Sequence, residues 1–172
     1  MAHEIDFRTA ILNAWKTTNR TTVFLIENIP AELWHVKIPG LPRRTIGMIA
    51  CHLHNSRCSW IKQIGKGQAI KMPVRVDHHR VRQNEVIRAL NHSSEAMLKL
   101  LDATMDNNGK LPTTPGWLNF PNDVAHFLAY FVAHEAHHRG QIIMLARQLD
   151  HRFSTEVTNG LWHWTRRLRE AK

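Results

Sequence analysis

The sequence VAHFLAYFVAHEAHHRGQIIMLARQL, residues 124–149, predicts an amphipathic helix that we place from about Pro121 to Asp150. At ~100° per residue, one set of its side chains falls within an arc of roughly 80°. This set is Phe127, Phe131, His134, His138, Ile142, Leu145 and Leu149. Two histidines therefore lie in the middle of a helix face that the apolar residues predict to be buried.

His134 and His138 need polar partners if this face is buried. A neutral imidazole without a hydrogen-bond partner in a core costs on the order of 1–3 kcal/mol. Histidines at positions i and i+4 point the same way from successive turns, which is the spacing that helical metal sites use. One bound metal ion would satisfy both rings, so this stretch predicts a metal site.

Three other segments of the chain show the same helical spacing of apolar residues. They cover residues 5–29, about 45–64 and about 77–105, and a shorter helix is predicted at 156–169. The connections at 31–44, 65–76 and 106–120 are rich in proline, glycine or charged residues, and no segment alternates like a strand. The sequence predicts one all-α domain over residues 1–172, a four-helix bundle with a short C-terminal helix.

The second predicted helix, capped by Thr45, contains two histidines that periodicity separates. Measured from the direction of Ile49, His52 lies ~60° away and His54 ~140° away. We therefore expect His52 at the edge of the buried face and His54 in solvent. The paired His78 and His79, near the start of the third predicted helix, are also expected in solvent.

His52, His134 and His138 form the predicted metal site. Three protein ligands leave at least one position open, as in catalytic rather than structural sites. All-imidazole ligation suits zinc, nickel, iron or copper. A divalent metal in such a site could activate water or a thiol at neutral pH. The structural alternative is three core histidines that only form hydrogen bonds.

The polar neighbours of the two histidines on the fourth helix have several possible roles. Gln141 lies on the same face as His134, where it could orient a ligand or form an ordinary interhelical hydrogen bond. Two roles remain open for Glu135: orienting a histidine of another helix, or facing solvent. Arg139 points further out and is expected at the surface.

His134, Glu135 and His138 also match His-Glu-x-x-His, the zinc metalloprotease motif. A metzincin would continue with glycine and histidine at fixed positions, where Gln141 and Met144 stand in this chain. Proteases of this class usually align their peptide along an edge strand, and the sequence predicts none. The bundle metal site is the favoured interpretation.

The charge balance is strongly basic, with 23 lysines and arginines against 14 acidic residues and a net charge of +9. Such a balance attracts polyanions, and DNA binding by a noncatalytic protein is the alternative function. The cations are scattered without a recognition-helix or stacking motif, which favours a nonspecific solvated surface. Nucleic acid is therefore not the expected partner.

The sequence predicts a soluble, cytoplasmic protein without a membrane segment. No apolar run approaches the ~20 residues that cross a bilayer, and the N-terminus lacks the pattern of a signal peptide. Cys51 and Cys58 lie two turns apart on one predicted helix, ~10 Å, which is too far for a disulfide between them.

The segment from Cys51 to Trp60 and the ending His134-x-x-x-His138-Arg-Gly-Gln141 resemble the DinB (damage-inducible) superfamily, the DinB/YfiT-like metalloenzymes. This resemblance covers nearly the whole chain. It implies a bundle with up-down-down-up connectivity, often a homodimer, and a metal held by His52, His134 and His138.

Characterised relatives include enzymes that use low-molecular-weight thiols, so the resemblance implies a thiol or another small molecule as a partner. We therefore expect an enzyme with zinc, nickel or iron that activates a thiol or water for transfer to a small electrophile, as a thiol S-transferase or a hydrolase.

Overall fold

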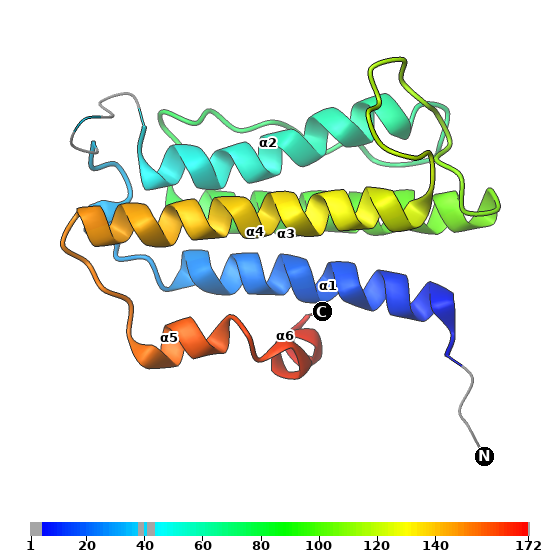
Figure 1. The fold of residues 1–172 in the computed structure, drawn as a ribbon. Helices are drawn as coiled ribbons and strands as arrows, with labels where there is room; N and C mark the ends of the chain where they lie inside the picture. The colour runs from blue at the N-terminus through cyan, green and yellow to red at the C-terminus, as the bar shows by residue number, and fades with distance from the viewer. Residues whose placement is uncertain (1–4, 38–39, 41–43, 172) are drawn as a thin grey trace.

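The computed structural model describes residues 5–37, 40 and 44–171. Four long helices form the body of this part (Figure 1): α1 (Phe7–Glu27), α2 (Ile46–Ile64), α3 (Gln83–Asp106) and α4 (Val124–Gln148). A 3-10 turn, η1 (Ala31–Leu33), follows α1, and α5 (Thr155–Gly160) and α6 (Trp164–Glu170) follow α4. The predicted all-α four-helix bundle is confirmed. Pro39 and Pro42 of the predicted first connection lie outside the described residues.

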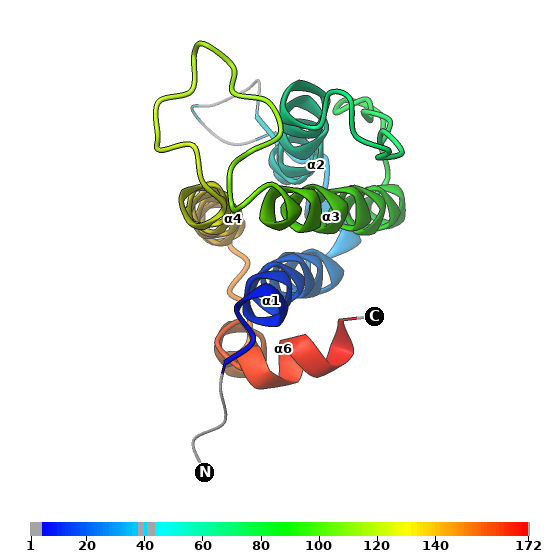
Figure 2. The ribbon, with the colours of Figure 1, turned by 90° about the vertical axis from the view of Figure 1, so that its right-hand side faces the viewer.

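The chain runs in one direction through α1 and α4 and in the opposite direction through α2 and α3 (Figure 1). This is the up-down-down-up connectivity that the family resemblance implies. Viewed along the bundle, α1 and α2 occupy opposite corners (Figure 2), and each of them packs against both α3 and α4. Because α2 and α3 are parallel, residues 65–82 have to return along the bundle between them.

Polar side chains set where the helices begin. Thr45 caps α2 as predicted, since its Oγ1 accepts a hydrogen bond from the Met48 amide at 3.2 Å. Asp123 caps α4 by accepting from the His126 amide at 2.8 Å, so α4 begins at Val124 rather than near Pro121. α3 begins at Gln83 rather than near residue 77, because residues 78–80 form a turn ahead of it.

The C-terminal segment forms two short helices instead of the single helix predicted at 156–169. The break follows Gly160, which is buried against Phe24 of α1: a Cβ at this position would lie 2.7 Å from the Phe24 ring. Glycine is unfavourable inside a helix, and the close approach of the Phe24 ring leaves no room for a larger residue at this position. The segment therefore turns, and α6 packs across α1.

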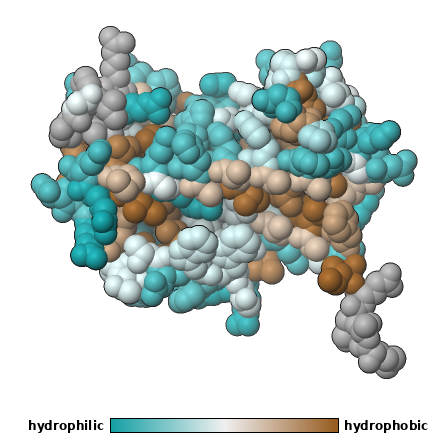
Figure 3. All heavy atoms as spheres, viewed as in Figure 1, coloured by the Kyte–Doolittle hydropathy of each residue, from teal (hydrophilic) through white to brown (hydrophobic). Residues whose placement is uncertain are grey.

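The outward face of α4 is lined with small apolar residues. Figure 3 shows them as a hydrophobic band along the middle of the molecule, with hydrophilic residues above and below. Its exposed members on α4 are Ala125, Ala129, Ala133, Ala136 and Met144. α4 is thus covered by neighbouring helices on its inner sides only.

The core consists of two apolar clusters, one toward each end of the bundle. One contains Leu25 and Leu53, and the other contains Trp15 and Phe131. Between them lies a layer of buried polar side chains, which we call the polar layer. Its members are Asn19 and Thr22 of α1, Arg57 of α2, Ser93 of α3 and Glu135 of α4.

An ion pair between Arg57 and Glu135 forms the centre of the polar layer, and both side chains are fully buried. Arg57 Nε donates to Glu135 Oε1 at 2.9 Å, and Nη2 lies 2.9 Å from the same oxygen without forming a second hydrogen bond. Arg57 Nη1 donates to Asn19 Oδ1 at 2.8 Å and to the Leu90 carbonyl at 3.0 Å. The guanidinium of one helix thus contacts all three of the others.

Thr22 completes the surroundings of the Glu135 carboxylate. Its hydroxyl donates to Glu135 Oε2 at 2.6 Å. Burying two charges is costly, and attraction in a low-dielectric interior offsets that cost only when further hydrogen bonds satisfy both groups. Here those hydrogen bonds come from α1 and α3, so the helices must keep one mutual register for the pair to be tolerated.

The Arg57–Glu135 pair predicts a large stability loss when one partner is removed. Glu135→Gln leaves the Arg57 charge buried without its anion, which should lower the free energy of unfolding by about 3 kcal/mol. Urea denaturation followed by circular dichroism measures this change. The matched control is Glu85→Gln, which removes the same charge from the exposed Arg82–Glu85 pair and should cost less than about 1 kcal/mol. Equal effects of the two substitutions would show that the buried pair does not hold the bundle.

Candidate metal centre

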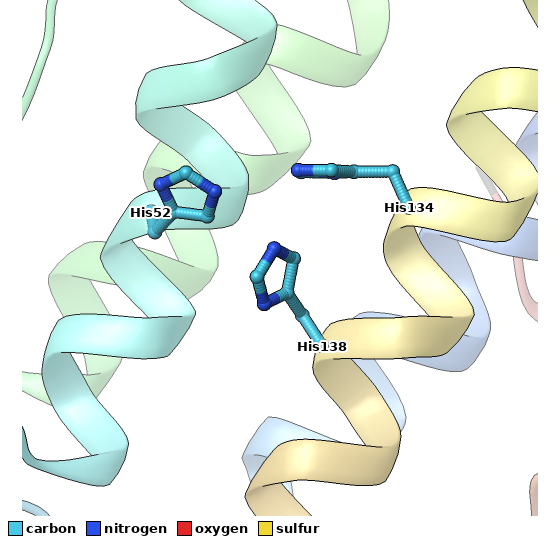
Figure 4. A group of neighbouring side chains, drawn as sticks. All are labelled: His52, His134 and His138. Carbon is cyan, nitrogen blue, oxygen red and sulfur yellow. The ribbon is translucent and has the colours of Figure 1, made fainter.

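The structure brings the three predicted ligands together at the interface between α2 and α4 (Figure 4). One possible ligand atom from each of His52, His134 and His138 lies within 4.8 Å of the others. The ring centroids are 4.6 Å apart for His52 and His138 and 4.5 Å apart for His134 and His138. Small side-chain rotations would bring nitrogens at these separations to the ~2.0–2.1 Å bonds of a shared metal ion.

The three rings differ in exposure, and the site is more open than the apolar stripe suggested. His138 is buried, His134 is partly buried and His52 is exposed. His52 therefore lies on the solvent side of α2 next to α4, rather than at the edge of a closed core. This leaves one side of the site accessible to a small molecule.

His134 carries the clearest sign that a ligand is needed. Its Nδ1 is buried and has no hydrogen-bond partner among the described residues. Burial, followed by the neighbouring charge of His138, lowers the pKa of His134 to about 4. The ring is therefore neutral near pH 7, which is the form that binds a metal, and no described residue occupies its Nδ1.

Gln141 orients His138, which decides between the two roles that the sequence left open. Gln141 Oε1 lies 2.8 Å from His138 Nδ1, while its Nε2 donates to His137 Nε2 at 3.0 Å. A carbonyl oxygen only accepts, so the proton of His138 is on Nδ1 and the lone pair on Nε2 is free for a metal. Burial also lowers the pKa of His138, which keeps the ring neutral.

Glu135 and Arg139 lie away from the histidines, on the side of α4 that faces α1. Glu135 neither faces solvent nor orients a histidine of another helix, since it is fully buried against Arg57 and Thr22. Arg139 is partly buried rather than at the surface, and its Nη1 donates to Thr22 Oγ1 at 2.9 Å. The sequence reasoning missed both positions because α4 packs against α1 as well as α2, so its buried arc is wider than one stripe.

The position of Glu135 also bears on the metalloprotease motif. In that chemistry the glutamate is the general base beside the metal-bound water. Here both carboxylate oxygens accept hydrogen bonds inside the polar layer. The geometry does not supply the base that a protease of this type requires.

His54 is buried, contrary to the prediction that it lies in solvent. Its Nε2 lies 2.8 Å from the Val74 carbonyl and its Nδ1 lies 3.1 Å from Ser93 Oγ. The reason is that α3 and the returning connection 65–82 cover the side of α2 opposite to α4. His54 anchors that connection and does not belong to the histidine site.

A pocket of about 400 Å³ opens beside His52 and His138. Besides these two histidines, it is lined by Met48, Ile49 and Asn55 of α2 and by Arg44, Arg75 and His78. His78 was expected in solvent alone, whereas the structure also places it in this lining. Arg44 and Arg75 lie in irregular segments, where no periodicity points to a site.

Comparisons with known proteins identify the family to which the chain belongs. No curated protein and no solved structure gave a significant match. Among the described residues, no helix is both long and apolar enough to cross a membrane. The family model described as "DinB family" matches residues 1–163, nearly the whole chain, so the resemblance is confirmed and the chain belongs to the DinB family.

Proposed function

We propose that this protein is a metal-dependent enzyme that activates a thiol or water for transfer to a small electrophile. His52, His134 and His138 would hold zinc, nickel or iron and leave a position open for the nucleophile. The observation that carries the proposal is the convergence of three imidazoles from two helices, with ligand atoms within 4.8 Å of one another. The unpaired Nδ1 of His134 supports the same conclusion.

A bound divalent metal would lower the pKa of a coordinated thiol or water so that it reacts as an anion at neutral pH. The side chains supply positioning. Gln141 fixes the orientation of His138, and the polar layer fixes the spacing of α2 and α4. The exposed side of His52 faces the pocket, which is where a substrate would enter.

The alternative function, a noncatalytic DNA-binding protein, has only the net charge of +9 in its support. Cytoplasmic location and a homodimer remain predictions from the sequence. Every step of the proposed chemistry depends on the metal.

Metal content after reconstitution tests the ligand set. We expect about one divalent ion per chain by elemental analysis. His138→Ala should abolish stoichiometric binding, whereas His92→Ala, which removes an exposed histidine of α3, should leave it unchanged. Full metal content in the His138 variant would show that the ligand assignment is wrong.

Gln141→Leu tests the orientation of His138. Losing the acceptor frees the His138 ring to adopt the other tautomer, so metal affinity should fall about tenfold with unchanged stoichiometry. Competition with a chromophoric chelator measures this affinity. Gln148→Leu is the control, since it makes the same change at an exposed position of the same helix. If Gln141→Leu binds as tightly as the control, the hydrogen bond to His138 does not position the ring.

Chelation distinguishes a metal site from three histidines that are only structural. A ligand that binds the folded state alone stabilises it, so removing the metal should lower the melting temperature. The His138→Ala variant should show no such shift. If the chelator leaves the melting temperature of the reconstituted parent protein unchanged, the three histidines do not form a metal site.

A further inference from the structure

Among the described residues, the ionisable side chains that line the pocket beside the histidines are all basic, with no acidic residue among them. Arg44, Arg75 and His78 line it together with His52 and His138, and its described lining contains no aspartate or glutamate. Arg44 and Arg75 also take part in none of the ion pairs formed by the described residues. The pocket thus presents two guanidinium groups that no described carboxylate neutralises.

The two residues that flank Arg75 in the chain both contact α2 through their backbone. The Val74 carbonyl lies 2.8 Å from His54 Nε2, a buried ring of α2. The Val76 backbone pairs twice with the Asn55 amide, as its N–H donates to Oδ1 and its carbonyl accepts from Nδ2, both at 3.0 Å. These contacts fix the backbone of Arg75 beside the pocket.

The Arg75 side chain contacts α2. Its Nη1 donates to Ser59 Oγ at 2.9 Å, which leaves other donors of the guanidinium free. Arg44 lines the same pocket, so both cations lie beside His52 and His138.

We propose that this pocket binds a carboxylate of the small molecule whose thiol or electrophilic group reaches the three histidines. The assignment rests on the proposed metal function and specifies its ligand class. Guanidinium groups present planar donors that match a carboxylate, and a neutral or cationic ligand would not neutralise their charge. A volume of about 400 Å³ lies at the lower end of ligand pockets, so the ligand is small.

A pair of thiols tests this assignment on the full-length protein loaded with Co²⁺. The probes are 3-mercaptopropionate and 3-mercaptopropan-1-ol, which share chain length and differ in the carboxylate. Thiolate coordination gives a charge-transfer absorption band, and its titration gives a dissociation constant for each thiol. We expect the carboxylate to bind about tenfold more tightly, the effect of one charge-assisted hydrogen bond.

Arg75→Gln should remove most of this preference while 3-mercaptopropan-1-ol binds as before. Arg44→Gln should reduce it too, and it provides an independent variant if Arg75→Gln does not fold. Arg80→Gln is the matched control, because it removes an exposed arginine from the same connection outside the pocket lining. A preference that survives both pocket substitutions, or falls equally in the control, would overturn the assignment.

The outcomes separate this inference from the proposed function. Absence of bound metal, or of a thiolate band with either thiol, would contradict the metal-dependent activation of a thiol. A thiolate band of equal affinity for both probes would contradict only the carboxylate site. Metal content measured on the same samples distinguishes these results.

Discussion

The buried Arg57–Glu135 ion pair is the interaction on which the arrangement of the bundle depends. It crosses from α2 to α4 and draws further hydrogen bonds from α1 and α3. The candidate metal ligands lie on the same two helices, with His52 five residues before Arg57 and His134 directly before Glu135. The ion pair inside the bundle therefore fixes the separation of α2 and α4 at the level where the histidines meet outside it.

One short stretch of α4 serves two sites because successive residues on a helix point ~100° apart. His134 and His138 meet His52 of α2 at the edge of the bundle, whereas Glu135 and Arg139 point into its interior and share Thr22 as a partner. The resemblance of this stretch to the His-Glu-x-x-His motif is therefore a coincidence of spacing. Its glutamate stabilises the packing of the bundle, and only its histidines are in a position to bind a metal.

Periodicity predicted the helices and the three histidines because each depends on a local pattern. The same reasoning failed for His54, Glu135 and Arg139, since it assigns one buried direction to a helix that has neighbours on more than one side. α2 packs against α3 and α4, and α4 packs against α1 and α2. The buried arc of each helix is consequently wider than its apolar stripe, and polar residues can lie within it when partners from other helices satisfy them.

Periodicity could not place Arg75 and His78 in the pocket, because their positions depend on how the helices are connected. α2 has 19 residues and is about 28 Å long. Since α3 runs parallel to it, the chain must return over that distance before α3 begins (Figure 1). His54 and Asn55 hold the returning segment against α2, and this brings Arg75 and His78 beside His52. A bundle with a tight turn between antiparallel α2 and α3 would lack this segment, so the up-down-down-up connectivity itself supplies the charged side of the pocket.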